Sequence, residues 1–241
     1  MNRRLLCLWS CLLLAPMARA APPQWGGSIV LSSDYLLRGV SRSDEEPAFS
    51  TELHTQWSNG VFAGIWASTA RPRTQAATTM EFSATLGYAH TLGENWLART
   101  SFSHYETPWS SVPGFYAYDE LTVDVIYLER LYLSASFSPN TSRYAPLWGP
   151  AWHRNAAAYE ASYQHAFTPL IHGALGLGYF DLSDLFGDGY WYSSAGLALN
   201  RGHWRLDLSY VITSGAAKRL TYGGSADNRA LASLSYSFSQ R

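Results

Sequence analysis

Residues 203–213 read His-Trp-Arg-Leu-Asp-Leu-Ser-Tyr-Val-Ile-Thr, a pattern typical of a β-strand. Apolar side chains occupy every second position from Trp204 to Ile212, and polar side chains fill most of the positions between them. Residues 229–239, Arg-Ala-Leu-Ala-Ser-Leu-Ser-Tyr-Ser-Phe-Ser, largely repeat the alternation. Because successive side chains of a β-strand point to opposite faces, each strand has one face suited to lipid and one suited to water.

Segments of this kind recur along the whole chain after the first 25 residues. We predict strands at residues 26–37, 47–58, 61–70, 79–91, 95–105, 119–128, 130–138, 155–167, 169–181, 190–200, 203–213 and 228–239. Short and long connections alternate between them, and short ones such as Ser58-Asn59-Gly60 and Arg201-Gly202 have the composition of tight turns. The sequence therefore predicts an all-β fold. It is an antiparallel transmembrane β-barrel of about 12 strands, with short periplasmic turns and longer extracellular loops.

The first twenty residues have the features of a secretory signal peptide. Arg3 and Arg4 precede an apolar run, and Ala18-Arg19-Ala20 is a small-x-small cleavage site. The run is too short for a membrane-spanning helix, which disfavours an uncleaved anchor. We expect residues 1–20 to be cleaved after Ala20, with export through the Sec route. Residues 21–241 then form a single outer-membrane β-barrel domain, because no linker divides them.

Composition excludes several classes of function. Without the three leader arginines, 14 of the 17 basic residues remain against 18 acidic residues, a net charge of −4, and no basic cluster suggests nucleic acid. Cys7 and Cys11 lie in the leader, so the mature chain has no disulfide and no cysteine nucleophile or metal ligand. A soluble sandwich or barrel is the alternative fold, but its polar face would be rich in lysine and glutamate. Lys218 is the one lysine here.

Aromatic residues gather near both ends of the predicted strands. Those beside the short turns are Trp57, Trp96, Phe167, Trp204 and Phe238. Those near the long loops are Tyr35, Phe49, Tyr105, Tyr118, Phe137, Tyr179 and Trp191. Two belts of amphipathic rings at the headgroup levels of a bilayer would have this placement.

The face opposite the lipid face has charges of both signs, and these are our candidate lumen-lining residues. They are Asp34, Arg38, Glu52, His54, Glu81, Arg99, Glu120, Asp124, Glu160, Arg205, Asp207 and Arg229. One interpretation is a pore lining that selects solutes by charge. The other is a set of cross-strand ion pairs that fill a closed lumen. The sequence leaves both open.

Other motifs are weaker, and we assign no catalytic, metal-binding or cofactor-binding residue. Asp44, Glu45 and Glu46 could supply oxygen ligands, but their spacing matches no defined metal loop, so a solvated loop is the better interpretation. The glycines between Gly173 and Gly178 fit a strand and not a phosphate-binding loop, since no helix follows. Some outer-membrane barrels hydrolyse lipids with a Ser–His pair. Here no histidine lies beside a serine with an evident orienting carboxylate, so we predict that the chain is not an enzyme.

The stretch Ser33-Asp-Tyr-Leu-Leu-Arg-Gly-Val-Ser-Arg-Ser-Asp44 resembles the opening motif of the Gcw-CHP family of proteobacterial outer-membrane proteins. Members of this family are often labelled TorF-type porins. The similarity continues, in order, through Gly60–Ser68, Met80–Phe82, Leu133–Asn140, Tyr159–Tyr163 and Ala226–Arg229. The resemblance implies a barrel in the outer membrane of a Gram-negative bacterium, with the role of a porin.

Together these features predict a passive channel for small solutes. The inward carboxylates Glu52, Glu81, Glu120 and Asp124 are not simply matched by arginines on the predicted strands, so we expect a weak cation preference. The alternative is a plugged structural or surface-interaction barrel without transport. The expected partners are outer-membrane lipid, the barrel-assembly machinery and, if the lumen is open, small solutes.

Overall fold

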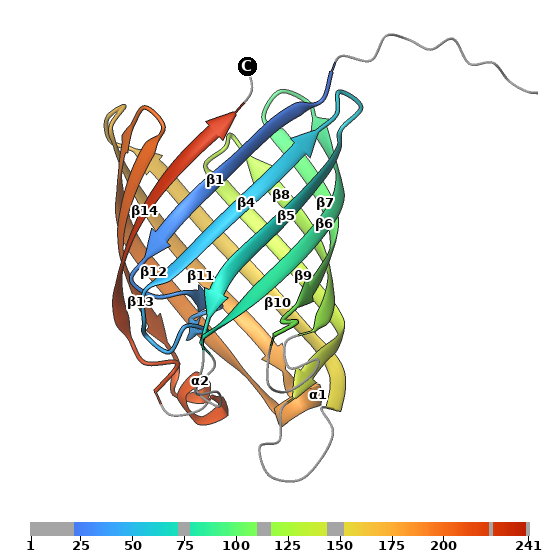
Figure 1. Cartoon of the computed structure of the whole chain (residues 1–241), viewed down its shortest axis with the longest axis vertical. Helices are drawn as coiled ribbons and strands as arrows, with labels where there is room; N and C mark the ends of the chain where they lie inside the picture. The colour runs from blue at the N-terminus through green and yellow to red at the C-terminus, as the bar shows by residue number, and fades with distance from the viewer. Residues whose placement is uncertain (1–21, 72–77, 110–116, 144–151, 222–223, 240–241) are drawn as a thin grey trace, which may run out of the picture.

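The computed structural model describes residues 22–71, 78–109, 117–143, 152–221 and 224–239. In this part of the chain, antiparallel strands form a closed barrel (Figure 1). Its strands are β1 (Gln24–Ser32), β4 (Ala48–Gln56), β5 (Val61–Ala70), β6 (Thr79–Leu92), β7 (Trp96–Glu106), β8 (Tyr118–Tyr127), β9 (Leu131–Arg143), β10 (Trp152–Ala166), β11 (Ile171–Leu182), β12 (Asp188–Arg201), β13 (Trp204–Thr213) and β14 (Arg229–Ser239). Neighbours in sequence pair with each other, and β1 pairs with β14 to close the ring. The predicted twelve-stranded antiparallel barrel is confirmed.

The first strand is shorter than we predicted, and the residues after it form a separate hairpin. We predicted a strand at residues 26–37, but β1 ends at Ser32. Leu36–Leu37 (β2) and Val40–Ser41 (β3) instead pair with each other in a separate two-stranded sheet. The alternation of residues 26–37 did not distinguish one long strand from a strand followed by a hairpin. A smaller difference is that β9 continues beyond the predicted residue 138, to Arg143.

The two ends of the barrel are built differently (Figure 1). The tight turns and the end of β14 lie at one end, which we call the short-turn end. The described parts of the long connections lie at the other end, which we call the long-loop end, together with the short helices α1 (Ser183–Phe186) and α2 (Gly215–Leu220). No helix in the described ranges is long and apolar enough to cross a membrane.

The two faces of the wall follow the alternation of the sequence. Large apolar side chains such as Ile65, Leu86 and Leu175 are more than half exposed on the outer face. The inner face has hydroxyl pairs that join neighbouring strands. They are Ser50 with Ser68 at 2.9 Å, Thr85 with Ser103 at 2.8 Å and Thr122 with Ser136 at 2.9 Å. An apolar exterior and a hydroxyl-lined interior are the requirements of a barrel in lipid.

Part of the predicted aromatic belt is wrong. Tyr118 is buried and stacks on Tyr105, with ring centroids 4.5 Å apart. Tyr105 and Tyr118 are on the same face of β7 and β8 as the inward residues Ser103 and Glu120, so both rings lie inside the barrel. Tyr35 also lies inside, with its hydroxyl 3.4 Å from Glu81. These three tyrosines fill the lumen and do not contact headgroups.

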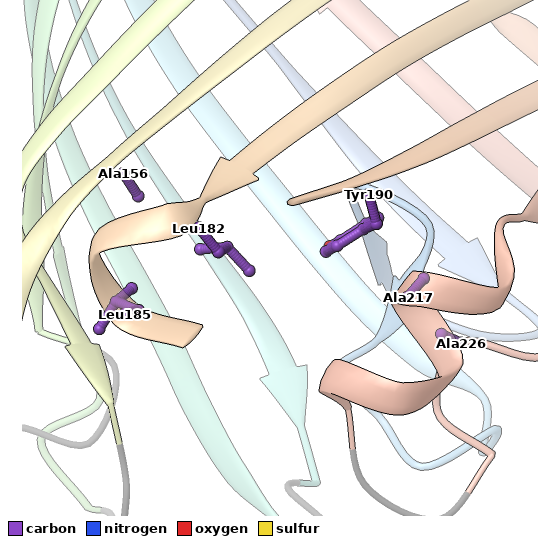
Figure 2. Packing of buried hydrophobic residues seen from close by; sticks show 6 residues of the cluster. All are labelled: Ala156, Leu182, Leu185, Tyr190, Ala217 and Ala226. Atoms are coloured by element: carbon purple, nitrogen blue, oxygen red, sulfur yellow. The ribbon is translucent and has the colours of Figure 1, made fainter. Parts of the chain in front are cut away.

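A small apolar cluster lies at the long-loop end (Figure 2). Its buried members come from β10, β11, β12, the two helices and the chain before β14, and they are Ala156, Leu182, Leu185, Tyr190, Ala217 and Ala226. Val40 of β3 packs against this cluster. The hairpin formed by β2 and β3 is therefore held to the wall partly by apolar contact.

The orientation in the membrane gives a first prediction. The short turns should face the periplasm and the long loops the exterior. Single cysteines at Asn59, in a short turn, and at Asp184, in α1, should react differently with a membrane-impermeant thiol reagent added to intact cells. We expect labelling at position 184 and none at position 59. The opposite pattern would reverse the orientation.

The face assignment gives a second prediction. Leu208 is exposed on the outer face of β13, and Ser209 next to it points inward. Leu208→Arg should cost about 2–4 kcal/mol of barrel stability, because it places a charge in hydrocarbon. Ser209→Arg should cost much less, since a lumen can hydrate the guanidinium. Folding titrations into liposomes measure both, and equal costs would show that the faces are assigned wrongly.

Candidate functional site: the barrel lumen

The segment between β1 and β4, residues 33–46, folds into the lumen; we call it the inward segment. Its hairpin tip reaches Glu120 on β8 and Phe180 on β11. In the ring of strands, β8 and β11 are well separated from β1 and β4, from which the segment starts and to which it returns. The inward segment therefore crosses the interior of the barrel near its long-loop end.

The tip of the hairpin is a two-residue turn, Arg38-Gly39. Both residues have positive φ angles, 51° and 78°, and Leu37 pairs with Val40 on either side of them. Such a turn suits the twist of a tight hairpin. The turn places the Arg38 guanidinium 2.7 Å from the Glu120 carboxylate and 4.6 Å from the centre of the Phe180 ring. The side chains of Arg38 and Glu120 are only 8% and 9% exposed, so this ion pair is buried.

A second anchor forms on the returning arm of the inward segment. Arg42 lies 3.5 Å from one oxygen of Glu81, and the Tyr35 hydroxyl donates a hydrogen bond of 3.4 Å to the other. The side chain of Glu81, on β6, is completely buried. Burial raises the pKa of Tyr35 above its ordinary value, so its hydroxyl remains a donor. Glu81 is thus bonded to both arms of the segment.

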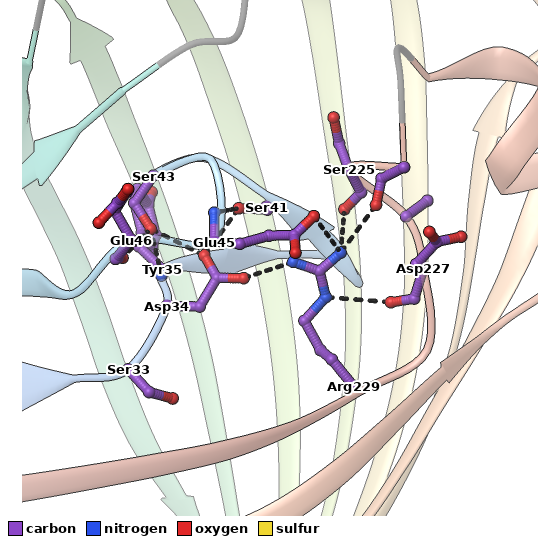
Figure 3. A network of polar contacts seen from close by, with 12 residues as sticks. Ser33, Asp34, Tyr35, Ser41, Ser43, Glu45, Glu46, Ser225, Asp227 and Arg229 are labelled. Carbon is purple, nitrogen blue, oxygen red and sulfur yellow. Dashed lines mark hydrogen bonds and ion pairs between the residues drawn. The ribbon is translucent and has the colours of Figure 1, made fainter.

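A third anchor is centred on Arg229 at the start of β14 (Figure 3). Its guanidinium lies 2.6 Å from Asp34 and 3.6 Å from Glu45, both in the inward segment. It also donates to the backbone carbonyls of Gly224 and Ser225. Asp34 in turn accepts hydrogen bonds from Ser41 and Ser43, each 2.7 Å long. This network connects the base of the segment to the last strand.

The other half of the lumen is more open. Near the short-turn end, Glu52 and His54 lie 3.3 Å apart, and their side chains are 47% and 50% exposed. The pairs Arg99–Asp124 and Arg205–Asp207, at 3.0 Å and 2.7 Å, also retain substantial exposure. The ion pairs of these groups are with one another and not with the inward segment. The lumen therefore has a vestibule on the short-turn side and is occupied on the long-loop side.

The twelve candidate lumen residues fall into these two halves. Asp34, Arg38, Glu81, Glu120 and Arg229 belong to the anchors of the inward segment, and Glu52, His54, Arg99, Asp124, Arg205 and Asp207 to the vestibule. Glu160 lies between them and accepts a hydrogen bond of 2.6 Å from the hydroxyl of Tyr192. Contrary to our prediction of a strand at residues 26–37, Asp34 does not lie on a wall strand but in the inward segment. Arg38, which follows that predicted strand, lies at the tip of the same segment.

The expected imbalance of charge has a different origin from the one we predicted. Glu81, Glu120 and Asp124 are each paired with an arginine: Arg42, Arg38 and Arg99, respectively. In the described ranges, no arginine lies within ion-pair distance of Glu52 or Glu160. Arg42 is not among the predicted lumen residues, because it lies in a loop and is far from Glu81 in sequence. The inward tyrosines could have been found, since each of Tyr105 and Tyr118 alternates in phase with polar inward residues.

The weaker candidate motifs take structural roles. Glu45 and Glu46 lie 3.6 Å and 3.5 Å from Arg229 and Arg71, and the glycine-rich stretch forms part of β11. Within the described ranges, no group of three histidine, cysteine, aspartate or glutamate side chains is placed to hold a metal ion. The predicted cleavage site after Ala20 lies outside the described residues.

Comparison with known proteins now places the chain in a family. The family described as "Bacterial protein of unknown function (Gcw_chp)" matches residues 17–238. The chain belongs to this family. No curated protein matches it. The resemblance inferred from the motif beginning at Ser33 is therefore confirmed.

Solved structures show the same fold. The KdgM porin is 10% identical, with a TM-score of 0.53 over 89% of this chain and 99% of that one. The NanC porin is 14% identical, with a TM-score of 0.54 over 90% of this chain and 98% of that one. A third structure is described as "KdgM porin in complex with disordered oligogalacturonate", at 10% identity and a TM-score of 0.53. The fold of this family member is thus that of outer-membrane porin barrels.

The anchors of the inward segment give a third prediction. Arg38 and Arg42 are sites at which trypsin could cleave, but in the folded barrel both are held inside the lumen. Glu81→Gln combined with Glu120→Gln removes the carboxylate from each of the two ion pairs that Arg42 and Arg38 form with the wall, a loss of the kind that costs about 3–5 kcal/mol per pair. We expect the segment to leave the lumen and trypsin to cleave after Arg38 or Arg42. Mass spectrometry of the folded barrel identifies the cut.

The matched control removes the same charge elsewhere. Asp124→Asn with Asp207→Asn deletes two carboxylates from the vestibule, where the inward segment makes no contact with them. This variant should remain as resistant to trypsin as the wild-type barrel. Equal cleavage of both variants would mean that the ion pairs at Glu81 and Glu120 do not hold the segment.

Proposed function

We propose that this protein is a passive channel of the outer membrane for small solutes, and that the inward segment narrows its outer half. The observation that carries the proposal is the contrast between the two halves of the lumen. Glu52 and His54 are half exposed in the vestibule, whereas Arg38, Glu120 and Glu81 are buried against the inward segment. A polar interior with exposed charged side chains in one half and a folded segment in the other is the architecture of a channel with a constriction.

The charges of the lumen favour small cations or neutral solutes. Five arginines of the lumen each lie within 3.5 Å of a carboxylate; they are Arg38, Arg42, Arg99, Arg205 and Arg229. Glu52 and Glu160 remain in excess, which supports the weak cation preference. One similar porin structure contains oligogalacturonate, an acidic oligosaccharide. Such a solute would be drawn by arginines without carboxylate partners, and the lumen arginines named here are already compensated.

A second candidate is a plugged barrel without transport. It is favoured by one observation: the inward segment has three separate anchors, at Glu120, Glu81 and Arg229, and Val40 packs in the apolar cluster. A segment with this many contacts could close the lumen permanently. Its long loops would then serve surface recognition. The proposed channel and the plugged barrel differ in whether the folded protein conducts ions.

The route to the membrane is part of the proposal. Removal of residues 1–20 after Ala20, export through the Sec route and insertion by the barrel-assembly machinery are supported by the leader sequence and by membership of an outer-membrane fold. No catalytic role is proposed.

Planar-bilayer recordings test the channel. In about 1 M KCl, where charges are screened beyond about 3 Å, the conductance reports the width of the path more than its charge. The wild-type barrel should conduct in small steps. Glu81→Gln with Glu120→Gln should conduct in larger steps, because the inward segment no longer narrows the lumen. Asp124→Asn with Asp207→Asn, the charge-matched control, should keep the wild-type step.

Two results would each contradict one part of the proposal. If neither the wild-type barrel nor the Glu81→Gln, Glu120→Gln variant conducts, while both are folded by heat-modifiable migration, the plugged barrel is correct. If the two conduct with the same step size, the channel stands but the inward segment is not its constriction.

A further inference from the structure

Glu52 and His54 form the one charged pair of the vestibule, among the inward residues named above, that contains no arginine. They are two residues apart on β4, and Leu53 between them is exposed on the outer face, so both point into the lumen. The carboxylate of Glu52 lies 3.3 Å from Nδ1 of His54. Gly26 on β1 is directly opposite His54, and the imidazole lies over the position that a side chain there would occupy.

The strands on both sides of this pair bring no other charge to it. On β1, Gly26 and Ser28 are opposite His54 and Glu52. On β5, Gly64 and Trp66 take the corresponding positions. Farther round the vestibule, the arginines of the Arg99–Asp124 and Arg205–Asp207 pairs are compensated by their own carboxylates. The net charge at Glu52 therefore depends chiefly on His54.

One other imidazole points into the same half of the lumen. A side chain at Gly173 would meet the ring of Phe167 on the outer face, so the adjacent His172 on β11 faces inward. Its neighbours across the strands are Ala166 and Ala198, and the nearest charged pair on that side is Arg205–Asp207, on β13. His172 has no carboxylate directly opposite it and serves as the natural comparison for His54.

Only imidazole, of the side chains in this vestibule, ordinarily changes charge between about pH 5 and pH 8. Carboxylates and guanidinium groups ordinarily keep their charge over that interval. With a neutral imidazole, Glu52 is an excess negative charge beside the permeation path. With an imidazolium, the pair is neutral. Fixed charge in a narrow polar tube acts strongly on passing ions. A change in the charge of the Glu52–His54 pair should therefore change the relative permeability to cations and anions.

We propose that the Glu52–His54 pair determines the ion selectivity of the lumen and makes it depend on pH. While the imidazole is neutral, the pair contributes one negative charge and the channel prefers cations. Once the imidazole is protonated, that charge is cancelled and the preference falls, with Glu160 as the remaining excess carboxylate. This inference rests on the proposed channel function, but it assigns the selectivity to a specific pair in the vestibule and not to the inward segment.

The test measures the permeability ratio of K⁺ to Cl⁻ in planar bilayers under a salt gradient near 0.1 M, where screening extends over about 10 Å. The barrel is used as the wild type and in the Glu81→Gln, Glu120→Gln background, whose larger conductance improves the measurement. We expect the ratio to exceed one at about pH 8 and to fall toward one at about pH 5. His54→Gln should keep the ratio nearly constant over this interval. Glu52→Gln should lower the ratio at both pH values.

Two controls isolate the pair. His165→Gln changes an imidazole on the outer face and should leave the pH dependence intact. His172→Gln removes the other inward imidazole and should leave most of the pH dependence of the permeability ratio. His54→Asn is a second variant at the key position, in case His54→Gln does not fold.

The outcomes separate the inference from the channel function. A conducting barrel whose ratio does not change with pH would overturn the inference and leave the channel function intact. The same holds if the dependence survives in both His54 variants but disappears in His172→Gln, since His172 would then be the titrating group. Absence of conductance from every folded variant would overturn the channel itself.

Discussion

The strands can cross a membrane because their sheet closes on itself. In a bilayer, each backbone N–H and C=O group needs a partner within the protein, and strands satisfy this only when the last one pairs with the first. Here β1 and β14 pair from Gly26 with Ser239 to Ser32 with Ser233. Closure fixes which face of every strand looks inward, so the polar positions of twelve strands are gathered into one lumen.

A lumen of this size must be filled by water, by side chains or by a folded segment. We infer that water fills the vestibule. In the long-loop half, side chains such as Tyr105 and Tyr118 and the folded inward segment fill the lumen. The segment binds the wall chiefly through ion pairs, at Glu120, Glu81 and Arg229. Taking both partners of such a pair out of water costs much of what their attraction returns, so buried pairs specify position more than they add stability.

Sequence alone predicted most of the wall, because alternation and turn composition are local signals. It could not predict the inward segment, because the position of this segment depends on contacts between residues that are far apart in sequence. Arg38 and Glu120, for example, are 82 residues apart. Leu36 and Leu37 continued the apolar character of the first strand, and only Arg38-Gly39 hinted at a turn. The alternation along each strand predicted which side chains face the lumen. It could not predict their ion-pair partners, because alternation gives the face of a side chain but not its neighbours on other strands of the barrel.

The wall and the inward segment can therefore be considered as two units with separate energetics. The ladders of β1 end at Ser32 and those of β4 begin at Ala48, so no wall strand includes the segment. Among its backbone hydrogen bonds to other parts of the chain are those from Ser41 to Ser225 and from Arg71 to Arg42, both 2.8 Å long. Removing the segment would expose its charged groups to water, which solvates them well, while the closed sheet keeps its hydrogen bonds. In the proposed channel, the width of the path would therefore depend chiefly on the contacts of this segment, and less on the stability of the closed sheet.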